Sequence, residues 1–181
     1  IVMDTWPRTI GVSPDSQQVF LASKALVGAS EWHLYVFDRD PATGTLSESQ
    51  QAVVPGRSTT FHTAASEDGA SLYLAGTEGL IALQRDALTG DWAVVQTIPP
   101  SGARSVLVSP NGQDVYVGGY SGTEPLSWYS RDAATGLLTV IQSYSNGQDG
   151  IDGLGYPEAL ALSADGRFLF VACSDADTLV A

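Results

Sequence analysis

The chain has 181 residues and a formal net charge of −12, with 44% hydrophobic and 15% charged residues. This apolar content is typical of a folded globular chain and excludes a disordered one. No apolar run approaches the ~20 residues of a membrane-spanning helix. No basic stripe is present to neutralise phosphates, so we expect neither a membrane span nor a nucleic-acid partner.

A polar turn of the type RDxxTG recurs along the chain. Its copies start at Arg39, Arg85 and Arg131, at a constant spacing of 46 residues. A glutamine follows each arginine after eleven residues, giving Gln50, Gln96 and Gln142. A fixed period with a second residue in phase indicates a repeat protein.

A second turn, of the type SPDG, lies between the copies of the first. Extended runs rich in β-branched and aromatic residues separate the turns, which start at Ser13, Ser66, Ser109 and Ser163. In the third repeat these runs cover 105–108, 115–117, 126–130 and 137–142. Four short strands joined by tight turns predict an antiparallel meander, the unit of one propeller blade.

In chain order the repeat predicts an all-β protein, a single partial β-propeller domain over residues 1–181. Its blades of four antiparallel strands are expected at Arg8–Gln51, Thr60–Gln96 and Arg104–Gln142, followed by a half blade at Glu158–Ala181. Rings typically contain ~4–8 blades. We therefore expect about three and a half blades of a seven-bladed ring, completed by further blades or by a second copy. The first residues lack the pattern of a signal peptide and are expected to be the tail of an earlier blade.

The connections between strands divide into two faces. The RDxxTG and SPDG turns keep a constant length on one face, which indicates a structural role. On the other face the connections vary in length, as at Lys24–Glu31, Gly76–Gly79 and Ser143–Pro157. Variable loops on a rigid scaffold are where binding usually occurs. We expect a protein or small-molecule ligand on this variable-loop face.

The first strand of each repeat offers a candidate site. Five residues before each SPDG-type serine stand Arg8, Phe61, Arg104 and Glu158, which are expected to converge at the mouth of a central channel. One hypothesis is a set of structural salt bridges. The other is an anion or lactone site, with Arg104 and Arg8 stabilising charge and Glu158 acting as a base. His62 follows Phe61, and strict alternation predicts that it points to the opposite face.

The chain resembles the 6-phosphogluconolactonase-like family of seven-bladed lactonase-type propellers. The resemblance rests on Arg104 before SPNG, Glu158 before SADGRFLFVA, and the RDxxTG pattern; the 146–154 connection is similar to large secreted bacterial repeat propellers of this type. It implies the propeller fold and a lactone-hydrolysing activity. The candidate catalytic residues are Arg104, Glu158, Arg8 and His62. Enzymes of the family carry a histidine at the channel position where this chain has Phe61.

Metal and cofactor chemistry has little support in the sequence. The single cysteine, Cys173, lies in an apolar run and is expected to be a buried hydrophobe. Carboxylates in two neighbouring loops offer oxygen ligands to Ca²⁺ without matching an EF-hand, and solvated turn residues are the alternative. These carboxylates are Asp149, Asp152, Asp175 and Asp177. No cofactor other than Ca²⁺ is expected.

Two functions of different class remain open. The favoured one is a binding or scaffold propeller in an extracytoplasmic location, periplasmic or secreted, with a cytoplasmic location as the alternative. The other is a lactonase-like hydrolase acting on a sugar-acid lactone at the channel mouth. The sequence favours the first because Phe61 stands where the family enzymes have a histidine. Whether the protein is an enzyme stays open at this point.

Overall fold

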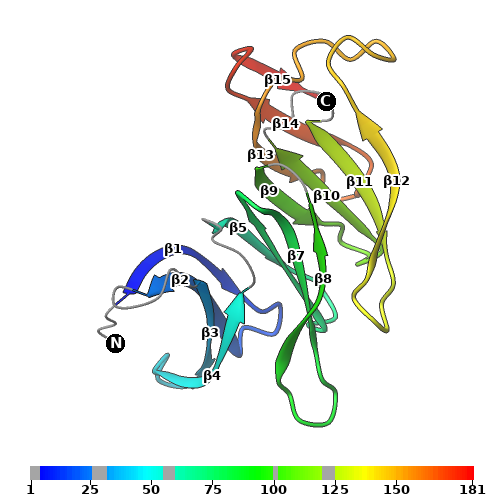
Figure 1. Cartoon of the computed structure of the whole chain (residues 1–181). Coiled ribbons are helices and arrows are strands. Elements are labelled where there is room, and N and C mark those ends of the chain that lie inside the picture. Colours follow the sequence, from blue (N-terminus) through cyan, green and yellow to red (C-terminus); the bar gives the residue numbers. More distant parts are fainter. Residues whose placement is uncertain (1–4, 26–31, 55–59, 100–101, 120–124) are drawn as a thin grey trace.

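The computed structural model describes residues 5–25, 32–54, 60–99, 102–119 and 125–181 (Figure 1). These residues form fifteen strands in four antiparallel sheets, and within each sheet every strand is hydrogen-bonded to the next one along the chain. The strands are β1 (Thr5–Val12), β2 (Gln18–Ala25), β3 (Trp32–Arg39), β4 (Leu46–Val54), β5 (Thr60–Ala65), β6 (Ser71–Gly76), β7 (Gly79–Arg85), β8 (Trp92–Ile98), β9 (Ala103–Val108), β10 (Asp114–Gly119), β11 (Leu126–Arg131), β12 (Leu138–Tyr144), β13 (Pro157–Leu162), β14 (Leu169–Cys173) and β15 (Thr178–Val180).

The strands form four sheets that correspond to propeller blades. Blade 1 contains β1–β4, blade 2 β5–β8 and blade 3 β9–β12, whereas blade 4 contains the three strands β13–β15. The predicted fold is therefore confirmed: an all-β chain with about three and a half propeller blades. The described part of the chain contains no helix with the length and apolarity needed to cross a membrane.

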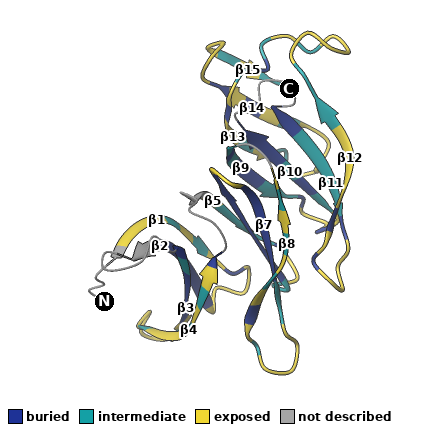
Figure 2. Ribbon diagram, viewed as in Figure 1, coloured by how far each residue is buried: buried dark blue, intermediate teal, exposed yellow. Residues whose placement is uncertain are grey.

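The blades are arranged side by side in an arc. Their first strands β1, β5, β9 and β13 contact one another in that order along the inner side, and the last strands β4, β8 and β12 lie on the outer side (Figure 1). Buried residues concentrate on the middle strands, while β4 and β12 are largely exposed (Figure 2). The core lies between neighbouring sheets: Phe20 and Trp32 of blade 1 share a buried cluster with Leu72 and Leu83 of blade 2.

Each SPDG-type turn is closed by its serine. In blade 2 the Oγ of Ser66 donates to Oδ1 of Asp68 at 2.6 Å and accepts from the backbone N–H of Ser71 at 2.9 Å. Gly69 follows with a φ of 67°, a conformation that favours glycine. The same serine contacts occur in the other three blades, at Ser13, Ser109 and Ser163.

Each RDxxTG turn is closed by its aspartate. Oδ1 of Asp86 accepts hydrogen bonds from the backbone N–H groups of Leu88 and Thr89 at 2.7 and 2.9 Å. The equivalent aspartates Asp40 and Asp132 accept the same pair of bonds. These side-chain bonds add to the backbone hydrogen bonds of the turn, such as the one from the N–H of Gly90 to the carbonyl of Asp86. Together they give the constant turns a structural role.

Two of the recurring glutamines make hydrogen bonds between neighbouring blades. The Gln50 carboxamide donates to the backbone carbonyl of Trp92 at 2.8 Å and accepts from its N–H at 2.7 Å. Gln96 makes the same two bonds to Leu138, at 3.0 and 2.8 Å. In both cases a bulge in the fourth strand directly precedes the glutamine. Gln50 and Gln96 therefore each join the last strand of one blade to the last strand of the next.

Candidate functional site

The inner strand of every blade contains a β-bulge at the same position. The strand register shifts between Pro7 and Thr9, between Thr60 and His62, between Ala103 and Ser105, and between Pro157 and Ala159. The extra residues are those singled out from the sequence: Arg8, Phe61, Arg104 and Glu158. A bulge interrupts strand alternation and re-aims the side chain it carries, and bulges are over-represented next to active sites.

The bulges of blades 3 and 4 place Arg104 and Glu158 together. Nη1 of Arg104 lies 3.6 Å from Oε2 of Glu158, with the two side chains 25% and 38% exposed. The other carboxylate oxygen, Oε1, accepts a hydrogen bond from Oγ of Ser174 at 3.3 Å. The side chains of Arg104, Glu158 and Ser174 thus form one polar group that is partly exposed to solvent.

Ser174 was not identified from the sequence. It lies directly after β14, outside both repeated turns, and no motif marks it. Its approach to Glu158 follows from strand pairing, because the end of β14 lies beside the start of β13, where Pro157 pairs with Cys173. Only the register of this pairing would have indicated the contact.

Arg8 occupies the equivalent bulge of β1 and is exposed. The inner strand β5 lies between β1 and β9, since β5 contacts both. Within the described ranges, Arg8 forms no ion pair with Glu158. Arg104 and Glu158 therefore form an ion pair, whereas strand β5 separates Arg8 from Arg104.

His62 points toward the next blade. Its Nδ1 lies 3.0 Å from the backbone carbonyl oxygen of Val106 on β9, two residues beyond Arg104. A carbonyl only accepts, so Nδ1 is the donor, which leaves Nε2 as an acceptor in the neutral ring. Strict alternation predicts that His62 points to the face opposite to that of Phe61. The bulge at Phe61 interrupts this alternation, so the prediction does not apply here. The side chain is exposed on the inner strand and directed at β9.

The four acidic residues considered for Ca²⁺ are all exposed. Among the residues that the structure describes, no group of three or more His, Cys, Asp or Glu side chains is arranged to hold a metal ion. Asp149 and Asp177 have positive φ angles of 51° and 50°, typical of turn residues. Cys173 is a free, buried cysteine, as predicted.

The variable-loop face is described in part. The loops over residues 26–31 and 120–124 lie outside the described residues. The longest connection, 143–157, packs against blade 4 through Leu154, which is 1% exposed. The N–H of Leu154 donates to Oδ1 of Asn146 at 3.1 Å, and Oγ1 of Thr178 donates to the carbonyl of Gly153.

Residues 62–181 match the family described as Lactonase, 7-bladed beta-propeller. The chain belongs to this family. No curated protein matches the chain. The matched region contains blade 3, blade 4 and nearly all of blade 2, including Arg104, Glu158 and Ser174. The lactonase-family match agrees with the resemblance stated from the sequence.

Solved structures give the same fold. A proposed 6-phosphogluconolactonase from Bacteroides uniformis is 20% identical with a TM-score of 0.77, and 97% of this chain covers 49% of that one. The periplasmic gluconolactonase PpgL of Pseudomonas aeruginosa is 22% identical with a TM-score of 0.71, at coverages of 97% and 49%. A protein from Lactobacillus plantarum is 25% identical with a TM-score of 0.71, at 97% and 50%. The chain thus spans about half the length of each of these three proteins.

Proposed function

We propose that this part of the propeller contributes the Arg104–Glu158 corner of a site that hydrolyses a sugar-acid lactone. The observation that carries the proposal is the 3.6 Å pair formed by two bulge residues of adjacent blades. A bulge places a side chain where regular alternation would not. Membership of the lactonase family and the fold shared with a gluconolactonase of Pseudomonas aeruginosa support this reaction class.

The paired groups suit the chemistry of ester hydrolysis. The Glu158 carboxylate takes a proton from a water molecule, and the resulting hydroxide attacks the lactone carbonyl carbon. The Arg104 guanidinium stabilises the negative charge that develops on the carbonyl oxygen. The ring C–O bond then breaks, and Glu158 returns its proton to the leaving alkoxide oxygen. The product is the open hydroxy acid.

Neighbouring groups support this assignment of roles. Ser174 donates to Oε1 of Glu158 and fixes the carboxylate, which leaves Oε2 beside the guanidinium. Arg104 is 25% exposed, so one side of its guanidinium can face a substrate. His62, directed at β9 two residues from Arg104, offers a further ring nitrogen able to bind a substrate hydroxyl.

The test is turnover of glucono-δ-lactone and its 6-phosphate by the intact protein, followed by the acid released. Glu158→Gln should lower kcat/KM by about 10²–10⁴-fold and Arg104→Ala by about 10²-fold or more. Matched controls are Glu67→Gln and Arg167→Ala, exposed charges in two of the tight turns, which should leave turnover within about twofold. Absence of turnover in the wild-type protein, or equal losses in controls and site variants, would overturn the proposal.

A second candidate is a binding module without catalysis. The observation favouring it is that both carboxylate oxygens of Glu158 already have partners, Arg104 and Ser174. Such a protein would bind a sugar acid or a protein segment through Arg104 without turning over a lactone. Calorimetry with gluconate separates the two: saturable binding that Arg104→Ala abolishes, with no hydrolysis, assigns the binding role.

A further inference from the structure

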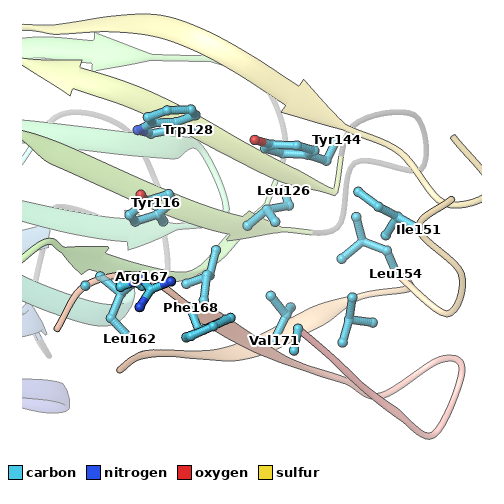
Figure 3. A pocket seen from close by; sticks show the side chains of 14 residues that line it. Tyr116, Leu126, Trp128, Tyr144, Ile151, Leu154, Leu162, Arg167, Phe168 and Val171 are labelled. Atoms are coloured by element: carbon cyan, nitrogen blue, oxygen red, sulfur yellow. The ribbon is translucent and has the colours of Figure 1, made fainter. Parts of the chain in front are cut away.

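The long connection 143–157 is anchored by apolar side chains before it enters β13. Leu154 shares a buried cluster with Leu126 of blade 3 and Val171 of blade 4, and Ile151 packs against the same cluster (Figure 3). These contacts hold the connection against the two blades that form the candidate site. The residues at the end of the connection therefore have a fixed position.

Two backbone hydrogen bonds join the end of this connection to the turn after β14. The N–H of Ser174 donates to the carbonyl of Tyr156 at 3.2 Å. The N–H of Asp175 donates to the carbonyl of Gly155 at 3.4 Å. The Oγ of Ser174 in turn donates to the carboxylate of Glu158 at 3.3 Å. Tyr156 and Asp175 thus flank the candidate site.

Tyr156 has a backbone conformation that glycine adopts at lower cost. Its φ is 49°, in the left-handed region, where a residue with a Cβ is strained. Tyr156 is 38% exposed, so burial in the core does not account for an aromatic residue at this position. Strained residues cluster at ligand-binding and active sites. An exposed tyrosine there offers a flat, rigid and partly apolar surface for a ligand.

Asp175 supplies an exposed carboxylate beside this tyrosine. A Cβ added to Gly155 would lie 3.5 Å from Oδ2 of Asp175, so the carboxylate lies against the backbone of the connection. Gly155 itself is outside the left-handed region, and its backbone does not require glycine. The missing side chain leaves Oδ2 uncovered on this side. A carboxylate accepts hydrogen bonds from hydroxyl groups and repels a phosphate group.

We propose that Tyr156 and Asp175 select a neutral, hydroxylated lactone as the substrate; this inference rests on the proposed function. The ring of Tyr156 packs against the C–H face of the sugar ring, and the carboxylate of Asp175 accepts hydrogen bonds from its hydroxyl groups. The same carboxylate disfavours a phosphorylated lactone. The two residues determine specificity, whereas Arg104 and Glu158 carry out the reaction.

Steady-state turnover by the intact protein tests the role of the tyrosine ring. Tyr156→Leu should raise KM for glucono-δ-lactone about fivefold with kcat nearly unchanged, because the lost contact is a binding contact. Tyr156→Phe keeps the ring and should stay within about twofold. Tyr156→Gly should raise KM as much as Tyr156→Leu without lowering the free energy of unfolding in urea, since glycine relieves the strain. Equal effects of Tyr156→Phe and Tyr156→Leu would overturn the role of the ring.

The role of Asp175 is tested with three lactones. Asp175→Asn should raise KM for glucono-δ-lactone about tenfold, and leave unchanged the turnover of δ-valerolactone, which has the same ring without hydroxyl groups. It should also raise kcat/KM for the 6-phosphate relative to the neutral lactone about tenfold. Asp149→Asn, at an exposed carboxylate of the same connection, is the matched control and should change neither. A wild-type preference for the 6-phosphate, or equal effects on glucono-δ-lactone and δ-valerolactone, would overturn the proposal.

Binding of glucono-δ-lactam separates this inference from the proposed reaction, because an amide replaces the ester in this neutral analogue. We expect saturable binding by calorimetry, weakened about fivefold by Tyr156→Leu and about tenfold by Asp175→Asn. These binding effects without any lactone turnover would reject the hydrolase and support the two specificity residues. No binding to the wild-type protein, or equal binding to the wild-type protein and both variants, would overturn the inference even where lactones are hydrolysed.

Discussion

The guanidinium of Arg131 in blade 3 forms an ion pair with the carboxylate of Asp68 in blade 2, with 2.8 Å between Nη2 and Oδ2. The arginine side chain is 1% exposed and the aspartate side chain 45% exposed. Arg131 also donates to the Oγ of Ser71 and, at 2.9 Å, to the carbonyl of Gly112. One side chain thus joins the RDxxTG position of one blade to the SPDG-type turn of the blade before it.

Replacing Arg131 should loosen the contact between blades 2 and 3. Removing one partner of a buried pair is costly because the remaining polar groups lose their bonds. Since Asp68 is partly solvated, we expect Arg131→Met to lower the free energy of unfolding by about 2–3 kcal/mol, measured by urea denaturation. Arg85→Met is the control. Arg85 is less buried and donates to Gly90, so its loss should cost under about 1 kcal/mol. Equal losses in the two variants would contradict the role given to Arg131.

The hydrogen bonds of the repeated glutamine give a second prediction, for which the equivalent glutamine of blade 3 is the control. Gln96→Ala removes two hydrogen bonds to Leu138 and should lower the free energy of unfolding by about 1–3 kcal/mol. Gln142→Ala, at the equivalent position of blade 3, should change it by less than about 0.5 kcal/mol because this carboxamide makes no such bond within the described part of the chain. A comparable loss in Gln142→Ala would show that its carboxamide is already engaged.

The sequence predicts the blade architecture well because the repeat is encoded locally. The serine and aspartate of each tight turn bond to backbone groups a few residues away, as Ser66 and Asp86 do. Such contacts leave a short motif at a fixed spacing. The contacts between blades are also regular, but their partners are distant: the repeated glutamine was found, while its binding to Trp92 needed the structure.

The sequence predicts which strand positions form the candidate site but not how the side chains at those positions are arranged. Arg104 and Glu158 were chosen because they precede equivalent turns, and they do form an ion pair. The bulge that carries them leaves no mark in the sequence, because the four bulge positions do not share one side-chain type: Arg8 and Arg104 are arginines, but Phe61 and Glu158 differ. The expectation for His62 relied on uninterrupted alternation. Ser174 required the register of β13 and β14.

Gly118 gives a prediction about the contact between blades 3 and 4. A Cβ at this position would lie 2.6 Å from the Oγ of Ser105 and 2.7 Å from the Cβ of Pro157 on β13. Inserting a methyl group into such a packed contact typically costs about 1–3 kcal/mol. Gly118→Ala should therefore lower the free energy of unfolding by this amount and also weaken any activity that depends on the Arg104–Glu158 pair.

Gly155→Ala is the matched control for Gly118→Ala. Its Cβ would lie 3.3 Å from the Cβ of Asp175, in an exposed loop that can adjust. We expect a change of under about 1 kcal/mol by urea denaturation. If Gly155→Ala is as destabilising as Gly118→Ala, close packing between the blades is not the cause.

The turn aspartates predict that the protein loses stability in acid. Hydrogen bonds from the serine hydroxyl and a backbone N–H hold the pKa of Asp15 and Asp165 below the ordinary value. At Asp68 burial acts to raise the pKa, but hydrogen bonds from Ser66, Ala70 and Arg131 outweigh it and the pKa is also lowered. The pKa values of the RDxxTG aspartates are lowered by backbone N–H donors; these are Asp40, Asp86 and Asp132.

A carboxyl group whose pKa is lower in the folded state binds its proton more readily when unfolded. Its contribution is therefore fully present above the unfolded value of about 3.9 and is lost as the pH falls through the folded pKa. Blade 3 supplies the control, because Asn111 accepts the same hydrogen bonds without a carboxylate. We expect the double variant Asp15→Asn, Asp165→Asn to keep its fold at pH 7. Its circular dichroism signal should fall less steeply than that of the wild-type protein as the pH is lowered. An unchanged acid profile in this double variant would show that other carboxylates cause the transition.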